Sequence, residues 1–148
     1  MNELSGKLMN TVDSAVPILR QVSDAESEKP TLKGGWSRKQ VIGHLIDSAS
    51  NNHQRFVRAA LQGSLEFPHY DQDGCVRVQA VQSAPWHLLI TLWTDYNLYL
   101  AHVIAHLPAD KLNAECRIGE DKPVTLRFLA EDYLRHLLHH LRQIGAAS

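Results

Sequence analysis

The sequence has few features that would direct it to a membrane or out of the cell. No stretch approaches the ~20 apolar residues that a membrane-spanning helix requires, and the N-terminus lacks the cationic start and apolar block of a secretory signal. Only two cysteines occur, Cys75 and Cys116, and they form no C-x-x-C pair. A disulfide framework or a thiolate metal site therefore has little support. We expect a cytoplasmic protein with two reduced thiols.

Neither sign of charge dominates, and the common nucleotide-binding motifs are missing. With 15 basic and 16 acidic residues, the chain has a net charge of -1 and no long-range field to attract nucleic acid or an anionic membrane. Local basic groups such as Lys33, Arg38 and Lys39 are too sparse to change this. The chain also lacks a P-loop, a dinucleotide fingerprint and the G-x-S-x-G elbow of serine hydrolases. Nucleic acid and membranes are therefore not expected as partners.

What is present favours one helical domain spanning residues 1–148. Hydrophobic residues make up 44% of the chain and charged residues 21%, as in ordinary soluble domains. Apolar residues recur at helical spacing at about residues 2–22, 37–62, 84–107 and 125–145. No segment shows a convincing strand alternation. The sequence therefore predicts an all-α fold, a four-helix bundle.

The predicted helix starts and the connections between helices carry further signals. Ser37 and Gln40 have capping-box spacing, and Thr125 can cap the last helix. Polar residues at 23–35 predict a loop. Residues 63–82 lose helical periodicity and form a connection far longer than the ~4–6 residues usual in compact domains. A connection of this length is commonly either functional or a crossover between distant ends of a bundle, here between helices two and three.

Histidine is the unusual component of this sequence. It occurs nine times, at positions 44, 53, 69, 87, 102, 106, 136, 139 and 140. His136 and His140 form H-x-x-x-H on the last predicted helix, one turn apart on one face, with a rise of ~6 Å between their α-carbons. Two imidazoles placed this way can reach one metal ion, although core or surface histidines also occur at this spacing.

Two other sets of histidines compete with or complement this pair. His102 and His106 have the same spacing, but they precede Pro108, where a histidine can interact with exposed helix carbonyls. His139 points about 100° away from its neighbour His140. His44 lies early in the second helix beside Gly43, which would let another helix or a ligand come close; a core histidine bonded to a carbonyl is the alternative.

Three blocks of sequence resemble the DinB/YfiT-like metalloenzyme family. They are W-S-R-K-Q-V-I-G-H-L-I-D-S (Trp36–Ser48), P-H-Y-D-Q-D (Pro68–Asp73) and Y-L-R-H-L-L-H-H-L-R-Q-I (Tyr133–Ile144). The blocks occur in the family's order. The resemblance implies a four-helix bundle with a long crossover after helix two, and a metal site formed by His44, His136 and His140.

Such a site would leave a divalent ion open to reaction. Three neutral imidazoles bring no negative charge, so the ion remains a strong Lewis acid, and three protein ligands with a free position are typical of catalytic zinc. Zinc or nickel is expected, with iron, manganese or copper as alternatives. The resemblance favours thiol-dependent transfer of a small molecule, with a low-molecular-weight thiol as partner. Hydrolysis by metal-bound water is the alternative.

Several polar residues are candidates to assist the chemistry. They are Asp47, Asp71, Asp132 and Arg55. Asp47 and Asp132 are spaced to approach the metal or orient a histidine ligand, although both can equally be solvated. Asp71 and Tyr70 lie in the family-like central block. A non-enzymatic metal-binding or interaction bundle is the contrasting hypothesis, and a homodimer is plausible for a bundle of this kind.

Overall fold

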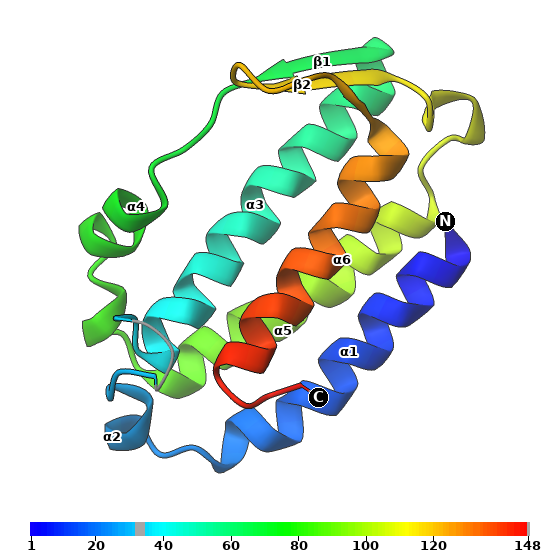
Figure 1. Ribbon diagram of the computed structural model, residues 1–148. Coiled ribbons are helices and arrows are strands. Elements are labelled where there is room, and N and C mark those ends of the chain that lie inside the picture. The colour runs from blue at the N-terminus through cyan, green and yellow to red at the C-terminus, as the bar shows by residue number, and fades with distance from the viewer. Residues whose placement is uncertain (32–34, 148) are drawn as a thin grey trace.

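Four long helices occupy the segments in which apolar residues recur at helical spacing (Figure 1). They are α1 (Asn2–Gln21), α3 (Arg38–Gln62), α5 (Trp86–Ala105) and α6 (Leu126–Gln143). The structure is a computed structural model that describes residues 1–31 and 35–147. Lys33 and part of the predicted 23–35 loop lie outside the described residues, and the rest of that loop contains α2 (Asp24–Ser27). The predicted four-helix bundle is confirmed.

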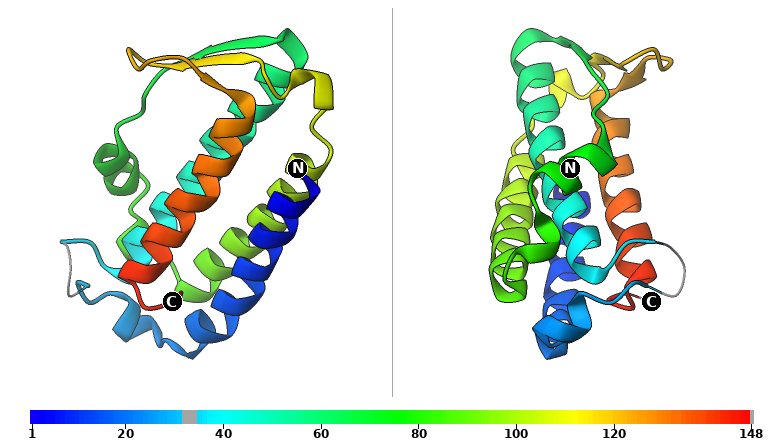
Figure 2. Two further views of the ribbon diagram at one scale, coloured as in Figure 1. Left: turned by 45° about the vertical axis from the view of Figure 1, so that its right-hand side comes forward. Right: turned by 90° about the vertical axis from the view of Figure 1, so that its left-hand side faces the viewer.

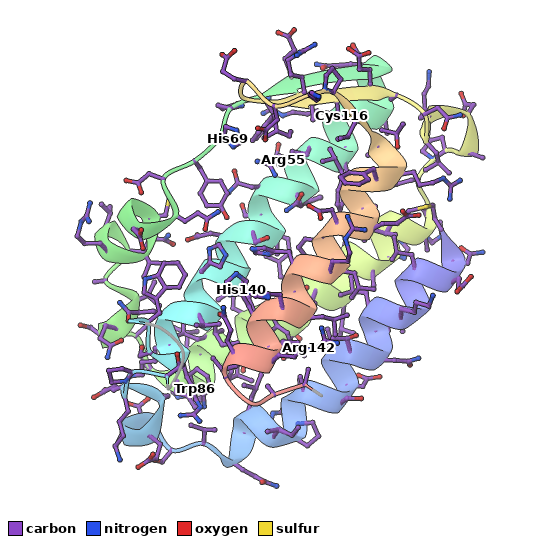
Figure 3. All side chains as sticks on the ribbon, viewed as in Figure 1. Arg55, His69, Trp86, Cys116, His140 and Arg142 are labelled. Carbon is purple, nitrogen blue, oxygen red and sulfur yellow. The ribbon has the colours of Figure 1, made fainter. Side chains whose placement is uncertain are left out.

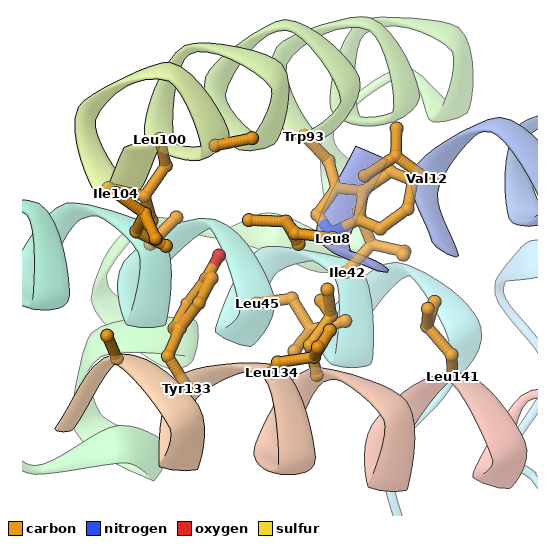
Figure 4. Packing of buried hydrophobic residues seen from close by; sticks show 14 of the residues in the cluster. Leu8, Val12, Ile42, Leu45, Trp93, Leu100, Ile104, Tyr133, Leu134 and Leu141 are labelled. Carbon is orange, nitrogen blue, oxygen red and sulfur yellow. The ribbon is translucent and has the colours of Figure 1, made fainter. Parts of the chain in front are cut away.

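The helices pack around one apolar core. α1 contacts α5, α5 contacts α3, and α3 contacts α6, which also touches α1. Each helix contributes fully buried side chains, as the close view of the core shows (Figure 4). Examples from the four helices are Leu8, Val12, Ile42, Leu45, Trp93, Leu100, Leu137 and Leu141. The apolar spacing read from the sequence therefore marks the inward faces of the helices.

Hydrogen bonds at two helix starts fix the helices that carry the histidines. The Gln40 backbone N–H donates to Ser37 Oγ over 3.2 Å, and the Ser37 backbone N–H donates to Gln40 Oε1 over 2.9 Å. The predicted capping box of α3 is therefore present. At α6, the Phe128 N–H donates to Thr125 Oγ1 over 3.1 Å, as expected for a cap.

The crossover after α3 is not a plain loop. It contains β1 (Ser64–Phe67), α4 (Gln72–Val78) and the 3-10 turn η1 (Val81–Ser83), and it returns the chain to the end at which α3 began (Figures 1 and 2). α3 and α5 consequently run in the same direction. The return path packs tightly on α3: a β-carbon at Gly43 would lie 2.4 Å from Val81 Cγ1. The close approach expected at Gly43 is therefore made by the crossover.

A small sheet, which the sequence did not predict, covers one end of the bundle. β1 pairs in parallel with β2 (Glu115–Ile118), and β2 pairs antiparallel with β3 (Val124–Thr125). The 3-10 turn η2 (Ala109–Lys111) precedes β2. These strands are too short to give a clear alternation, and parallel pairing joins segments far apart in the sequence. The sheet anchors the crossover at the end where α3 stops and α6 starts.

Charged groups also tie the segment before α3 to the bundle. Lys39 is only 1% exposed, and its Nζ lies 3.0 Å from both Asp24 Oδ2 and Glu28 Oε1. Burial acts to lower the pKa of Lys39, but its bonds to Glu28 and Asp24 outweigh that effect and raise it. Lys39 is thus a structural cation.

Among the described helices, none combines the length and the apolar character needed to cross a membrane.

Candidate metal centre

His44 from α3 and His136 and His140 from α6 meet in the space between these two helices. The Nε2 atom of His136 lies 3.1 Å from Nε2 of His44 and 3.1 Å from Nε2 of His140. One ring nitrogen from each residue falls within 4.8 Å of the other two. Figure 3 shows His140 on the side of α6 that faces α3. The structure therefore brings together all three of the histidines selected from the sequence.

The spacing of these nitrogens suits a small divalent cation. Zinc–imidazole bonds of about 2.0–2.1 Å in a tetrahedral arrangement place two ligand nitrogens about 3.3 Å apart. Two of the three separations, at 3.1 Å, are close to this value. Three Nε2 lone pairs aimed at one point repel each other unless a proton or a cation lies between them. The donor set therefore fits one divalent ion.

Burial keeps these imidazoles neutral. His44 is fully buried and its pKa falls to about 3, through loss of solvent and then through the nearby His136 and His140. The same causes, with His140 as the main neighbour, lower the pKa of His136 to about 4. Burial also lowers the pKa of His140, against a raising effect of Gln143. Neutral rings with a free lone pair are what a metal ligand requires.

The other ring nitrogens contact residues that set the direction of each imidazole. His140 Nδ1–H donates to Gln143 Oε1 over 2.8 Å, which leaves Nε2 as the acceptor. Ser48 Oγ lies 3.4 Å from His136 Nδ1. His44 Nδ1 is buried without a hydrogen-bond partner, and the Trp36 ring packs 5.2 Å from its ring centroid. Sequence reasoning missed Ser48 and Gln143. Ser48 follows His44 by four positions and Gln143 follows His140 by three, and both spacings were usable signals that these side chains lie on the same helix face as a ligand histidine.

The remaining histidines lie elsewhere. His102 and His106 are exposed, and His106 Nδ1 lies 2.8 Å from the His102 carbonyl oxygen, which confirms the expected contact with a helix carbonyl. His139 is exposed beside the site and bonds Gln143 Nε2. His53 contacts Tyr96, and His69 pairs with Asp121 across 3.3 Å. Among the described residues, His44, His136 and His140 are therefore the one group of side chains whose ligand atoms lie close enough together to hold a metal ion.

A cavity of about 260 Å³ opens next to His136. It runs between α3, α6, the crossover and the sheet. Its polar lining comes from Ser48, Asn52, Arg55, His69, Tyr70, Gln72, Asp121, Lys122, Asp132 and Tyr133. A small molecule in this space would lie against one of the three converging imidazoles. The cavity is slightly smaller than the ligand pockets of about 300–1,000 Å³ found in most proteins, and its place beside His136 is that expected of a site for a small substrate.

The assisting candidates from the sequence differ in where they lie. Arg55 lines the cavity, as does Asp132, whose carboxylate accepts from Arg135 over 2.9 Å. Asp47 accepts from Gln79 Nε2 over 2.9 Å, and burial raises its pKa. The Asp71 side chain accepts from the Gly74 N–H over 2.9 Å and caps α4. Asp47 thus ties α3 to the crossover and Asp71 caps α4, whereas Arg55 and Asp132 are the two candidates that line the cavity.

Comparison with known proteins gives the same picture of the fold. A protein of Bacillus pumilus (strain SAFR-032) named "Putative metal-dependent hydrolase" is 26% identical over 128 residues, which are 86% of this chain and 73% of the relative. The crystal structure of the mycothiol-dependent maleylpyruvate isomerase matches 99% of this chain with a TM-score of 0.82 at 16% identity. This chain covers 61% of that isomerase, less than two thirds of its length.

A second solved structure is similar over nearly its whole length. YfiT from Bacillus subtilis, described as a probable metal-dependent hydrolase with an unusual four-helix bundle topology, matches with a TM-score of 0.64 at 19% identity. The match covers 97% of this chain and 89% of YfiT. The sequence model of the DinB superfamily matches residues 10–144, nearly the entire chain. The protein therefore belongs to the DinB superfamily.

Proposed function

We propose that the protein is a metal-dependent enzyme that holds one divalent ion with His44, His136 and His140 and acts on a small molecule. The observation that carries the proposal is the convergence of three Nε2 atoms, 3.1 Å apart in two of the pairs, beside a cavity. A cation bound there would supply Lewis-acid chemistry. Zinc and nickel suit three imidazoles best, and the site leaves room for a further ligand.

Thiol-dependent transfer is the first chemistry that we assign to this site. In such a reaction the sulfur of a small thiol loses its proton and forms a bond to an electrophilic carbon of the second substrate, while the bond from that carbon to its leaving group breaks and the leaving group takes up the proton. This chain would supply three neutral imidazoles and a cavity that places the two reactants together. The similarity of fold to a mycothiol-dependent isomerase supports this assignment.

Hydrolysis is the second candidate, favoured by the names of two similar proteins. It would use the same cavity, with water in place of the thiol and an ester or amide as substrate. Asp132 lines the cavity, where its carboxylate bonds Arg135, and its position makes it our candidate for the general base of this reaction. The two chemistries therefore share the site and differ in the nucleophile.

One set of assays separates these readings. The zinc- and nickel-loaded protein is tested with small thiols plus electrophiles, and with esters and amides without thiol, against a His140→Ala variant. We expect turnover that needs both the metal and a thiol. Turnover of esters without thiol would favour hydrolysis. A melting temperature unchanged by chelator, with no turnover, would favour a non-enzymatic bundle. The cytoplasmic location and the homodimer stay predictions for fractionation and for measurement of molecular mass in solution.

A further inference from the structure

Arg55 is a nearly buried cation without a charged partner. Its residue is 9% exposed, and its Nε is buried with no hydrogen-bond partner. None of the ion pairs formed by the residues described in the structure includes it. Its guanidinium carbon lies 5.3 Å from the centre of the Phe67 ring. Burying an unpaired charge is costly, so a partner for this group is to be expected.

Arg55 lines the same cavity as His136, one member of the histidine cluster. His44, Ser48, Asn52 and Arg55 are spaced by four, four and three residues, which places them along one face of α3. Ser48 contacts His136, and Arg55 follows Ser48 by two helical turns, or about 10 Å. Figure 3 shows Arg55 nearer the sheet than His140. The cavity thus has His136, which contacts the other two imidazoles, near one end and a buried guanidinium toward the other.

The other groups around Arg55 leave its charge available. Asp121, at the cavity wall, pairs with His69, and Asp132 pairs with Arg135. Tyr70 lines the cavity as well, and burial, followed by the charge of Asp47, raises the pKa of its phenol to about 12. Tyr70 is therefore a neutral hydroxyl that can donate a hydrogen bond near the guanidinium.

We propose that Arg55 recognises a carboxylate of the substrate, and that the reacting end of the same molecule lies against His136. This inference rests on the proposed function and adds the class of substrate: a small organic acid. A guanidinium fork matches the two oxygens of a carboxylate.

The test uses cobalt(II) as the metal and simple thiols as probes. ω-Mercaptocarboxylates of increasing chain length are compared with the ω-mercaptoamides of equal length, and binding is followed by the sulfur-to-cobalt charge-transfer band. We expect the carboxylates to bind about 10- to 100-fold more tightly than the amides at the chain length that spans the cavity. Shorter acids, which cannot reach both groups, should lose this preference.

Two variants of arginine on α3 provide the matched comparison. Arg55→Gln should remove the preference for the carboxylate, and Arg55→Lys should keep part of it. Arg58→Gln is the control, because Arg58 is exposed, lies 5.9 Å from the same Phe67 ring and bonds Gln54. It should keep the full preference. If Arg55→Gln fails to fold, the wild-type comparison of acid with amide still tests the proposal, because equal binding of the two would overturn it.

The outcomes separate this inference from the proposed function. If cobalt does not bind, the proposed function fails and this inference fails with it. If cobalt binds but thiols give no charge-transfer band, thiol-dependent transfer and this inference are overturned and hydrolysis is left. If thiols bind the cobalt but acid and amide bind equally at every length, the role of Arg55 is overturned and the metal site stands. A preference that persists in Arg55→Gln would also overturn it.

Discussion

The chain carries the motif H-x-x-x-H twice, on α5 and on α6, and the two pairs differ in their surroundings. The ring centroids are 4.2 Å apart for His102 and His106 and 4.5 Å apart for His136 and His140. Spacing and ring separation are therefore nearly the same. The α5 pair is exposed at the end of its helix, whereas the α6 pair faces α3 and meets His44.

The comparison teaches that a histidine pair becomes a candidate metal site through what the facing helix provides. His44 supplies the third nitrogen, and burial lowers the pKa of the rings so that they are neutral. At the end of α5, His106 bonds a backbone carbonyl instead. A local motif thus acquires its chemistry from tertiary packing.

The largest effect is expected from removing one member of each pair. His136→Ala removes the nitrogen that contacts both other Nε2 atoms, and should lower metal affinity more than about 100-fold, beyond the usual effect of losing a group that only orients a ligand. His106→Ala, the matched change on α5, should leave affinity unchanged. Competition titration with a chelating dye measures both. Equal losses of metal affinity in the two variants would contradict the assignment of metal binding to the α6 pair.

A smaller effect should follow from changing the residue that orients His140. Gln143→Leu removes the acceptor for His140 Nδ1–H, and we expect metal affinity to fall about tenfold. Gln54→Leu is the control, because Gln54 is exposed on α3 and bonds Arg58. The same competition titration measures the metal affinity of both variants. An unchanged affinity in Gln143→Leu would mean that the ring of His140 is held by packing alone.

The smallest effect concerns stability of the metal-free protein against pH. The pKa of His44 is about 3 and that of His136 about 4 in the folded state, both below the ordinary 6.5. Between about pH 6.5 and 4 the unfolded chain binds more protons, so the free energy of unfolding falls as pH falls, by about 1 kcal/mol per pH unit for each of the two rings. Urea unfolding should show a shallower slope for His44→Gln. Parallel slopes for wild type and variant would contradict this.

The helices and the histidine pair of α6 were predictable from the sequence because both follow local rules. Apolar spacing located all four long helices, and Ser37 with Gln40 marked the start of α3. His136 and His140 lie one turn apart wherever the helix sits. That His44 joins them came from the resemblance, since nothing local places α3 against α6.

The remaining features depend on contacts between distant segments. The pairing of β1 with β2 joins residues such as Leu65 and Cys116, and four-residue strands leave no readable alternation. Asp71 stood in a family-like block, yet its bond to Gly74 depends on a short helix that was not predicted. Arg55 was a candidate by type alone, because its burial without a partner is visible only once α3, the crossover and the sheet are assembled.

X-ray absorption spectroscopy of the zinc-loaded wild-type protein tests the central claim most directly. The account predicts one bound ion with three imidazole nitrogens at about 2.0–2.1 Å and one exchangeable ligand that is not an imidazole. A spectrum without imidazole scattering, or with fewer than three imidazoles, would contradict the assignment of His44, His136 and His140 as its ligands.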